Sequence, residues 1–277
     1  MTNWLQLPKL TYRVWSVWRR NFEVFTKTIF VNFLPALMEP ILYLAAFGFG
    51  LGALFGAGGH IPGLGTMTYI QYIGPGLIAI AVMYGSFYEC TYASFVRMYY
   101  QKTFDAIIAT PVSVEEVIAG ELLWGASRAT INGTIVLAVV AAFGLVSSPW
   151  ALLVPVVAFF GGLLFASLGM CFTALASGID FFNFPTFLFI TPMFLLSGTF
   201  FPINVVPNAY ALEVVALSVF PLTHIVDMSR GLMSGNIGSL AGLSSTDMWA
   251  LSIVWVALVS LLFFVLSIYL MKKKLIK

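Results

Sequence analysis

The chain has 277 residues, of which 60% are hydrophobic and only 9% are charged, and its net charge is +2. Soluble domains carry about a quarter of charged residues, so this composition excludes a water-soluble globular protein. Because hydrophobic runs fill the chain, we expect one all-α membrane protein rather than several soluble domains.

Residues 1–28 are predicted to form an amphipathic helix that lies on the membrane surface. At a helical spacing of 3.6 residues, Val14, Trp18 and Phe22 share one face, while Arg13 and Arg20 lie on the opposite face. Aromatic side chains suit the membrane interface and cations suit the lipid headgroups. Such a helix serves as an anchor or also braces a peripheral partner, and the sequence leaves both interpretations open.

Six stretches are long and apolar enough to cross a hydrocarbon core, which needs about 20 residues per helix. The predicted spans are residues 29–55, 72–96, 129–146, 150–177, 184–201 and 249–271. They define a six-span domain over residues 29–277, with an inner loop at 97–128 and an outer segment at 202–248.

The distribution of cations predicts the orientation of these spans. If the spans alternate, every Lys and Arg except Arg230 falls on one side of the membrane. Cations are enriched in cytoplasmic loops. We therefore expect a multi-pass protein of the cell inner membrane with both termini in the cytoplasm.

Two acidic residues lie inside predicted spans, Glu39 in the first and Glu89 in the second. A central carboxylate costs about 2.5 kcal/mol on insertion scales, so each one needs a partner or a function. We favour a structural role, in which the acids pair with each other, with Asn32 or with tyrosines of neighbouring spans. The alternative is the proton relay of a secondary carrier.

The inner loop contains two predicted helical segments. Residues 99–109 form a short helix that Pro111 ends. Ser113 and Glu116 fit a capping box, so a new helix is predicted to start at Val114 and to continue into the third span. A short helix across the inner mouth offers a docking surface for a cytoplasmic partner, with a solvated loop as the alternative.

The outer segment 202–248 is predicted to be a re-entrant helical hairpin. Residues 209–220 are apolar but too few to cross the membrane, and Pro221 opens a second short helix. His224, Asp227 and Arg230 follow on that helix at three-residue spacing. We expect them to bond one another, with a gate or a substrate contact as the alternative.

Motifs of catalysis are missing from the sequence. No Gly-Lys dipeptide occurs, so a Walker A loop is excluded. The two Cys and two His residues lack the spacing of metal ligands, and we expect neither a metal site nor a cofactor bound by this chain. Two further alternatives remain, a membrane-embedded enzyme that uses Glu213, His224 and Asp227, and a scaffold subunit that transports nothing.

Several motifs occur in order along nearly the whole chain. They are VWRRNF at 17–22, EPILYL at 39–44, FYECTYASFVRM at 87–98, GELLW at 120–124, FASLGM at 165–170, TPMFLLSGTFFP at 191–202, PLTH at 221–224 and a basic C-terminal tail. In these motifs the chain resembles the permease subunits of type 2 ABC exporters, and most closely the nodulation protein J branch of that family.

This resemblance implies a permease that forms a homodimer and pairs with two copies of a separate ATP-binding subunit, which holds the ATP and Mg²⁺. The implied cargo is an amphipathic lipid, a glycolipid, a lipo-oligosaccharide, a polysaccharide or a drug, moved outward across the inner membrane, with membrane lipid around the chain and no nucleic acid bound. The coupling residues implied for the ATP-binding subunit are Tyr99, Tyr100, Lys102, Thr103, Asp105, Pro111 and Ser113. The implied outer gate comprises Pro202, Pro221, His224, Asp227 and Arg230.

Overall fold

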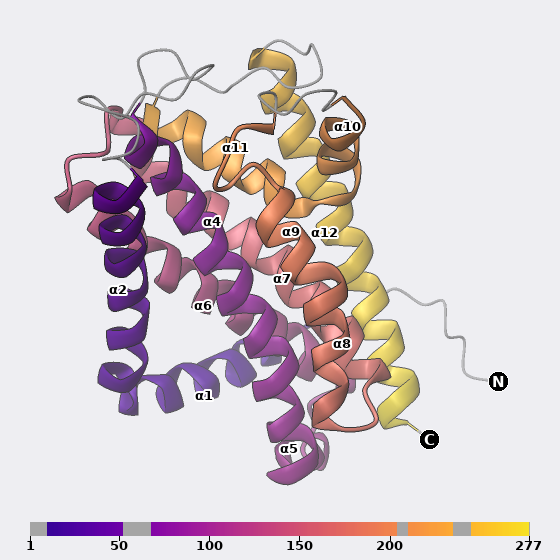
Figure 1. Ribbon diagram of the computed structural model, residues 1–277. Coiled ribbons are helices and arrows are strands. Elements are labelled where there is room, and N and C mark those ends of the chain that lie inside the picture. Colours follow the sequence, from indigo (N-terminus) through magenta and orange to yellow (C-terminus); the bar gives the residue numbers. More distant parts are fainter. Residues whose placement is uncertain (1–9, 52–67, 204–209, 235–244, 277) are drawn as a thin grey trace.

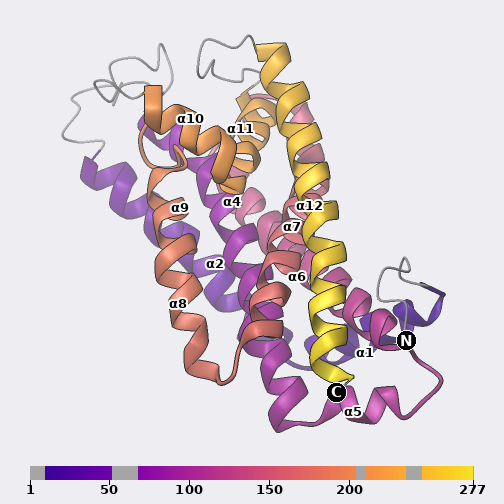
Figure 2. The same cartoon turned by 90° about the vertical axis from the view of Figure 1, so that its right-hand side faces the viewer.

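The computed structural model describes residues 10–51, 68–203, 210–234 and 245–276, and every regular element within these ranges is helical. Long helices run side by side from one end of the molecule to the other (Figure 1). We call the end that carries α1, α5 and the C-terminus the basal end, and the end that carries α10 and α11 the distal end (Figures 1 and 2). The predicted all-α fold is confirmed.

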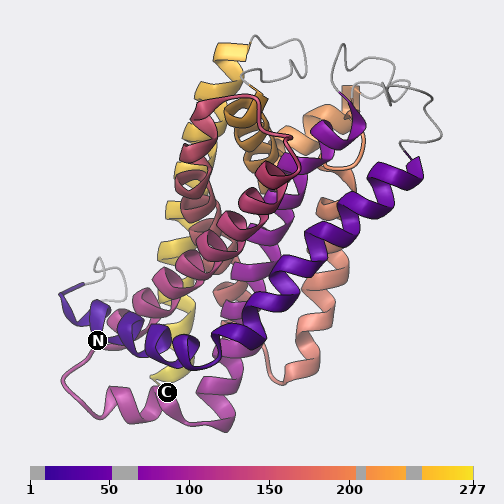
Figure 3. The ribbon, with the colours of Figure 1, turned by 90° about the vertical axis from the view of Figure 1, so that its left-hand side faces the viewer.

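Helix α1, Arg13–Lys27, lies across the basal end, and α2, Ile29–Ala45, turns away from it by 79° (Figure 3). The buried stripe of α1 consists of Val14, Val17, Asn21 and Phe25. This stripe is shifted from the predicted apolar face, because Phe22 is exposed while the polar Asn21 is buried. The close fit of α1 on α6 explains the shift, since a Cβ at Gly120 would meet the Val17 Cβ at 2.6 Å.

The core of the bundle is formed by four long helices. Helix α4, Tyr69–Tyr88, continues through π-helical turns to Tyr100. It packs against α6, Val114–Ala142, and α7, Val154–Leu175, and α7 also packs against α12, Ser245–Leu275. Small residues allow this close packing in lipid: a Cβ at Gly162 would meet the Ala129 Cβ at 2.5 Å.

A run of short helical segments crosses the molecule on a more exposed face. It comprises the 3-10 turn Ile179–Phe182, α8, Asn183–Pro185, the π-helical turn Thr186–Ile190, and α9, Thr191–Leu196. Together these segments span Ile179–Leu196, and only 22% of that run is buried inside the chain. Its phenylalanines divide between the two environments, because Phe184 and Phe187 are exposed whereas Phe182 is fully buried in the core.

Two short helices meet at the distal end. Helix α10, Tyr210–Val219, and α11, Pro221–Ser234, are bent by 94° relative to each other. Their bounds agree with the apolar segment and the Pro221 start that the sequence predicted. The parts of the predicted outer segment at 204–209 and 235–244 lie outside the described residues.

Five helical runs in the described ranges are long and apolar enough to cross a membrane. They are Tyr69–Tyr100, Val114–Ala142, Pro149–Leu175, Ile179–Leu196 and Asp247–Leu275, and the two bent pairs raise the number to seven if each pair is one span. The chain is therefore a multi-pass membrane protein with five to seven spans.

Candidate functional site

A short helix projects from the basal end between α4 and α6. This helix, α5, comprises Thr103–Ile108 and is shorter than the predicted 99–109, because α4 extends as far as Tyr100. The break falls at Lys102, which has a left-handed backbone with φ of 54°. Figure 2 shows α5 below the other helices.

The two faces of α5 differ sharply. Phe104 is fully buried in a core cluster with side chains of α6, whereas Asp105 is exposed. Lys102 and Tyr100 are exposed as well, and the Tyr99 ring packs at a tilt against Phe95 with ring centroids 4.4 Å apart. One buried aromatic ring thus fixes α5 while its outer face remains open to a partner.

The segment after α5 is held by a capping box and by α1. The Ser113 hydroxyl accepts from the Glu116 amide at 3.3 Å, and the Glu116 carboxylate accepts from the Ser113 amide at 2.8 Å. This confirms the predicted capping box. Arg13 of α1 donates to the Pro111 carbonyl, and Thr11 donates to Glu116. The segment from Pro111 to Glu116 is therefore held by α1 and by the residue Thr11 just before it.

The C-terminal end of α12 contacts residues both before and after α5 in the sequence. Lys272 forms an ion pair with Glu115, in the first turn of α6, at 2.5 Å. Lys274 donates to the carbonyls of Thr173 and Ala176 at the end of α7, and its ammonium lies 5.2 Å from the Tyr99 ring centroid. Cations are favourable at helix C-termini, so the basic tail has a structural role besides orientation.

A buried ionic network joins α1, α4 and α6 just above α5. Arg97 pairs with Glu121 at 2.6 Å and with Glu89 at 2.8 Å. Glu121 also accepts from Asn21 at 2.7 Å and from Ser94 at 2.8 Å. These groups, with Arg20 and Trp124, form what we call the basal network. Arg97 and Glu121 were not among the predicted site residues; the available signal was an acid in the apolar helix, eight residues after the Ser113 cap.

The basal network gives Glu89 a structural place in the fold. Its carboxylate accepts from Arg97 and, at 2.9 Å, from the Trp124 indole. The partners differ from the predicted ones, since Asn32 instead accepts from Arg128 at 2.7 Å and donates to Thr28.

Burial lowers the pKa of the Arg20 guanidinium, which also belongs to the basal network, and the nearby Glu121 carboxylate opposes that shift.

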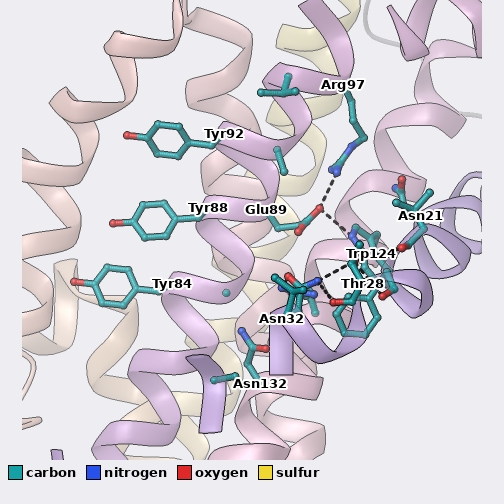
Figure 4. A pocket seen from close by; sticks show the side chains of 18 of the residues that line it. Asn21, Thr28, Asn32, Tyr84, Tyr88, Glu89, Tyr92, Arg97, Trp124 and Asn132 are labelled. Carbon is teal, nitrogen blue, oxygen red and sulfur yellow. Dashed lines mark hydrogen bonds and ion pairs between the residues drawn. The ribbon is translucent and has the colours of Figure 1, made fainter. Parts of the chain in front are cut away.

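A cavity of about 840 Å³, which we call the basal cavity, opens beside this network (Figure 4). It is walled by α1, α2, α4 and α6. In Figure 4, Glu89 leaves α4 on one side and the rings of Tyr84, Tyr88 and Tyr92 leave it on the other. Glu39 and Asn132 also line the cavity. Within the part of the chain that the structure describes, Glu39 forms neither a hydrogen bond nor an ion pair.

The residues predicted as an outer gate lie together at the distal end. Asp227 and Arg230 pair at 3.2 Å, and Arg230 also donates to the Gly198 carbonyl at 3.1 Å. The Arg230 guanidinium lies 4.0 Å from the Tyr72 ring centroid. The structure thus brings α4, α11 and the turn at Gly198 together around one buried ion pair.

His224 has other partners than the predicted ones. Its Nδ1 lies 3.0 Å from the Ser252 hydroxyl on α12, and its Nε2 lies 2.9 Å from the Leu217 carbonyl on α10. The imidazole also stacks on Trp255 at 4.6 Å. His224 therefore links α10, α11 and α12. Pro202 and Pro221, the two prolines of the predicted gate, are both buried. Pro221 is the first residue of α11.

Comparison with known proteins places these features in a family. The model of the family described as ABC-2 type transporter matches residues 12–234. Nodulation protein J of Rhizobium meliloti (strain 1021) is 38% identical over 233 residues, covering 83% of this chain and 84% of the relative. Nodulation protein J of Sinorhizobium fredii is 36% identical over 229 residues, covering 82% and 83%.

A more distant relative is named as a transporter. The inner membrane transport permease YadH of Escherichia coli (strain K12) is 25% identical over 224 residues, covering 80% of this chain and 82% of the relative. The family match spans α1, α5 and the basal network as well as the distal helices. The chain is a member of the ABC-2 type transporter family, in the branch of nodulation protein J.

Proposed function

We propose that this chain is the membrane-spanning permease of an ATP-driven exporter that moves an amphipathic lipid or glycolipid outward across the inner membrane. Two copies of the chain would pair with two copies of a separate ATP-binding subunit. The observation that carries this proposal is α5, a short helix fixed by the buried Phe104 with Asp105 exposed at the basal end.

The proposed topology has six spans. Residues Ile29–Ala45 and Ala46–Leu51 form a continuous helical run of about 34 Å at 1.5 Å per residue, long enough to cross. With the five long runs this gives six spans, and α1 lies at the interface. We place α10 and α11 as a re-entrant hairpin, because α10 is too short to cross and α11 is buried along most of its length.

The basal end is placed in the cytoplasm. The described cations gather there, on α1, around α5 and at the end of α12, whereas Arg230 lies at the distal end (Figures 1 and 3). This distribution agrees with the enrichment of Lys and Arg in cytoplasmic loops. In that orientation α5 faces the ATP-binding subunit, and the Asp227–Arg230 pair lies near the exit.

The cargo class is inferred from the relatives and from the basal cavity. The resemblance to the nodulation protein J branch implies a lipo-oligosaccharide among the candidate cargoes, and we adopt that class for this chain. The basal cavity begins at the interfacial helix and continues between α2 and α4, where a headgroup from the inner leaflet has polar contacts. A polar cavity beside lipid suits a molecule with a polar head and an apolar tail.

The proposal is tested by reversing the charge on the exposed face of α5. Asp105→Lys should lower substrate-stimulated ATP hydrolysis of the reconstituted complex by about tenfold, because an unmatched charge in an interface costs several kcal/mol. The matched control is Asp180→Lys, an exposed acid in another basal turn. Equal activity of the two variants and the wild type would argue against α5 as the contact with the ATPase.

A proton-coupled secondary carrier is the second candidate. One observation favours it: Glu39 lines the basal cavity and lacks an ionic partner among the described residues. A carrier of this kind would transport its cargo along a pH gradient in liposomes that hold this chain alone. Against it, Glu89 is engaged by Arg97 and Trp124, so the two acids do not form a ready relay.

A further inference from the structure

A line of polar side chains rises from the interfacial helix into the membrane-spanning part of the chain. On α2 it comprises Thr28, Asn32 and Glu39, and on α6 it comprises Arg128 and Asn132. Glu39 lies eleven residues after Thr28, so it is about 16 Å farther along the helix axis. That is roughly half of a hydrocarbon core about 30 Å thick.

The lower part of this line is satisfied within the protein. Arg128 donates to the Asn32 side chain at 2.7 Å and lies 4.5 Å from the Phe25 ring centroid. The Asn32 amide donates to Thr28. These groups form a polar entrance to the cavity. Its free-energy cost in the membrane is small, because each group has a hydrogen-bond partner.

The upper part of the line is different. In the described ranges neither Glu39 nor Asn132 forms a hydrogen bond with another residue, although both lie at membrane depth. Both also line a second cavity of about 60 Å³ that adjoins the first, together with Tyr84 and Gly85. Glu39 is exposed and Asn132 is half-buried, so both side chains are open to a ligand that enters these cavities, and hydrogen bonds to it would offset the cost of polar groups at this depth.

The absence of a side chain at Gly85 leaves room for the Asn132 side chain. A Cβ at Gly85 would lie 2.6 Å from the Asn132 Nδ2. The α6 amide therefore rests directly on the α4 backbone, where any larger residue would displace it. This contact fixes one hydrogen-bonding group at the deep end of the cavity, opposite the carboxylate of α2.

The chemistry of this deep site selects against anions. Glu39 accepts hydrogen bonds when ionised, and Asn132 both donates and accepts. The small deep cavity is lined by neither Lys nor Arg among the described residues. Of the cations that line the basal cavity below it, Arg97 is paired with two carboxylates, and Arg128 donates to Asn32 and lies over the Phe25 ring. Tyr84 lines the deep cavity as well, and Tyr88 lines the basal cavity below it. A carboxylate, an amide and aromatic rings suit a neutral head with many hydroxyl groups better than a phosphate.

We propose that Glu39 and Asn132 form a headgroup site that binds the hydroxyl-rich, uncharged head of an amphipathic glycolipid, while its alkyl chain stays in the lipid beside α2. This inference rests on the proposed function for the class of cargo, but it does not require that transport is driven by ATP. It explains why α2, which shares few contacts with α4, carries a carboxylate on the side that faces α4 and α6.

The test measures binding to the full chain in lipid nanodiscs, without the ATPase. The probe is a radiolabelled long-chain alkyl glucoside, compared with probes of the same chain bearing a phosphocholine or a trimethylammonium head. Glu39→Gln combined with Asn132→Leu should weaken glucoside binding by about tenfold or more, the loss expected when a hydrogen bond to a charged group is removed. Binding of the phosphocholine probe should be weak and unchanged. The trimethylammonium probe, which the Glu39 carboxylate also attracts, should bind less tightly than the glucoside to the wild type.

Two further variants keep the result interpretable. Gly85→Ala should weaken glucoside binding with Glu39 intact, because it displaces the Asn132 amide. Glu23→Gln, which alters an exposed acid of α1 outside the cavity, should bind as the wild type does. The proposal is overturned if the double variant binds the glucoside normally, if all three probes weaken together, or if a charged head binds best. Glucoside binding without ATP-dependent transport would instead count against the proposed function alone.

Discussion

Glu121 shows how this chain accommodates a charge in an apolar helix. Its carboxylate is fully buried and accepts hydrogen bonds from Arg97, Asn21 and Ser94. The donors come from α1 and from the π-helical continuation of α4. Because a buried charge is tolerated only when it is paired and hydrogen-bonded, this side chain helps to fix the orientation of α1.

Removal of Glu121 should therefore be strongly destabilising. Glu121→Ala leaves the Arg97 guanidinium with Glu89 as its one remaining acidic partner in the described part of the network, and we expect a loss of about 3–5 kcal/mol in unfolding free energy. Thermal unfolding of the purified permease in nanodiscs measures the effect. Glu23→Ala, which breaks the exposed Arg19–Glu23 pair, should change stability by less than about 1 kcal/mol. Similar unfolding temperatures for the two variants would refute a structural role for the network.

The sequence predicted local polar contacts better than distant ones. The Ser113–Glu116 capping box was predictable because both residues lie in one helical turn. The Asn21–Glu121 bond joins residues 100 positions apart, and no local pattern relates them. Asn21 was placed on neither predicted face of the amphipathic helix, although its burial is what fixes the stripe of α1.

At the scale of elements, α5 is a short helix whose position matters more than its length. It packs against the π-helical end of α4 and against α6. The sequence predicted its presence and the Pro111 stop. It did not predict the break at Lys102, because a left-handed lysine has no distinctive sequence signal. The π-helical extension of α4 to Tyr100 was missed for the same reason.

The tail of α12 should be needed for coupling through α5. Lys272→Glu replaces the ion pair with Glu115 by a repulsion, which should lower substrate-stimulated ATP hydrolysis several-fold. Adding Glu115→Lys restores opposite charges and should restore most of the activity. Lys273→Glu, an exposed neighbour of the same charge, is the matched control. Failure of the double variant to recover would show that the tail acts through something other than this pair.

At the scale of the whole molecule, composition alone predicted the class of protein, and the cation distribution predicted which end carries α5. The number of spans was harder, because length and apolarity do not tell a spanning helix from a bent pair. Both α1 with α2 and α10 with α11 pass those criteria only when joined. Tertiary contacts distinguish them: α1 packs across α6 through Gly120, while α11 is buried at the distal end.

The proposed permease depends on a partner for its driving force. Its sequence has no Walker A loop, its basal ions are paired across α1, α4 and α6, and its basal helix exposes Asp105. We therefore propose that energy reaches the chain at α5, which follows directly after the π-helical turn that carries Arg97.

The most direct measurement is transport of a fluorescent glycolipid in liposomes, with and without the ATP-binding subunit. We predict outward movement only when the subunit, ATP and Mg²⁺ are all present, and none with the chain alone under a pH gradient. Movement of the glycolipid by the chain alone would contradict the account and would favour a carrier that uses Glu39.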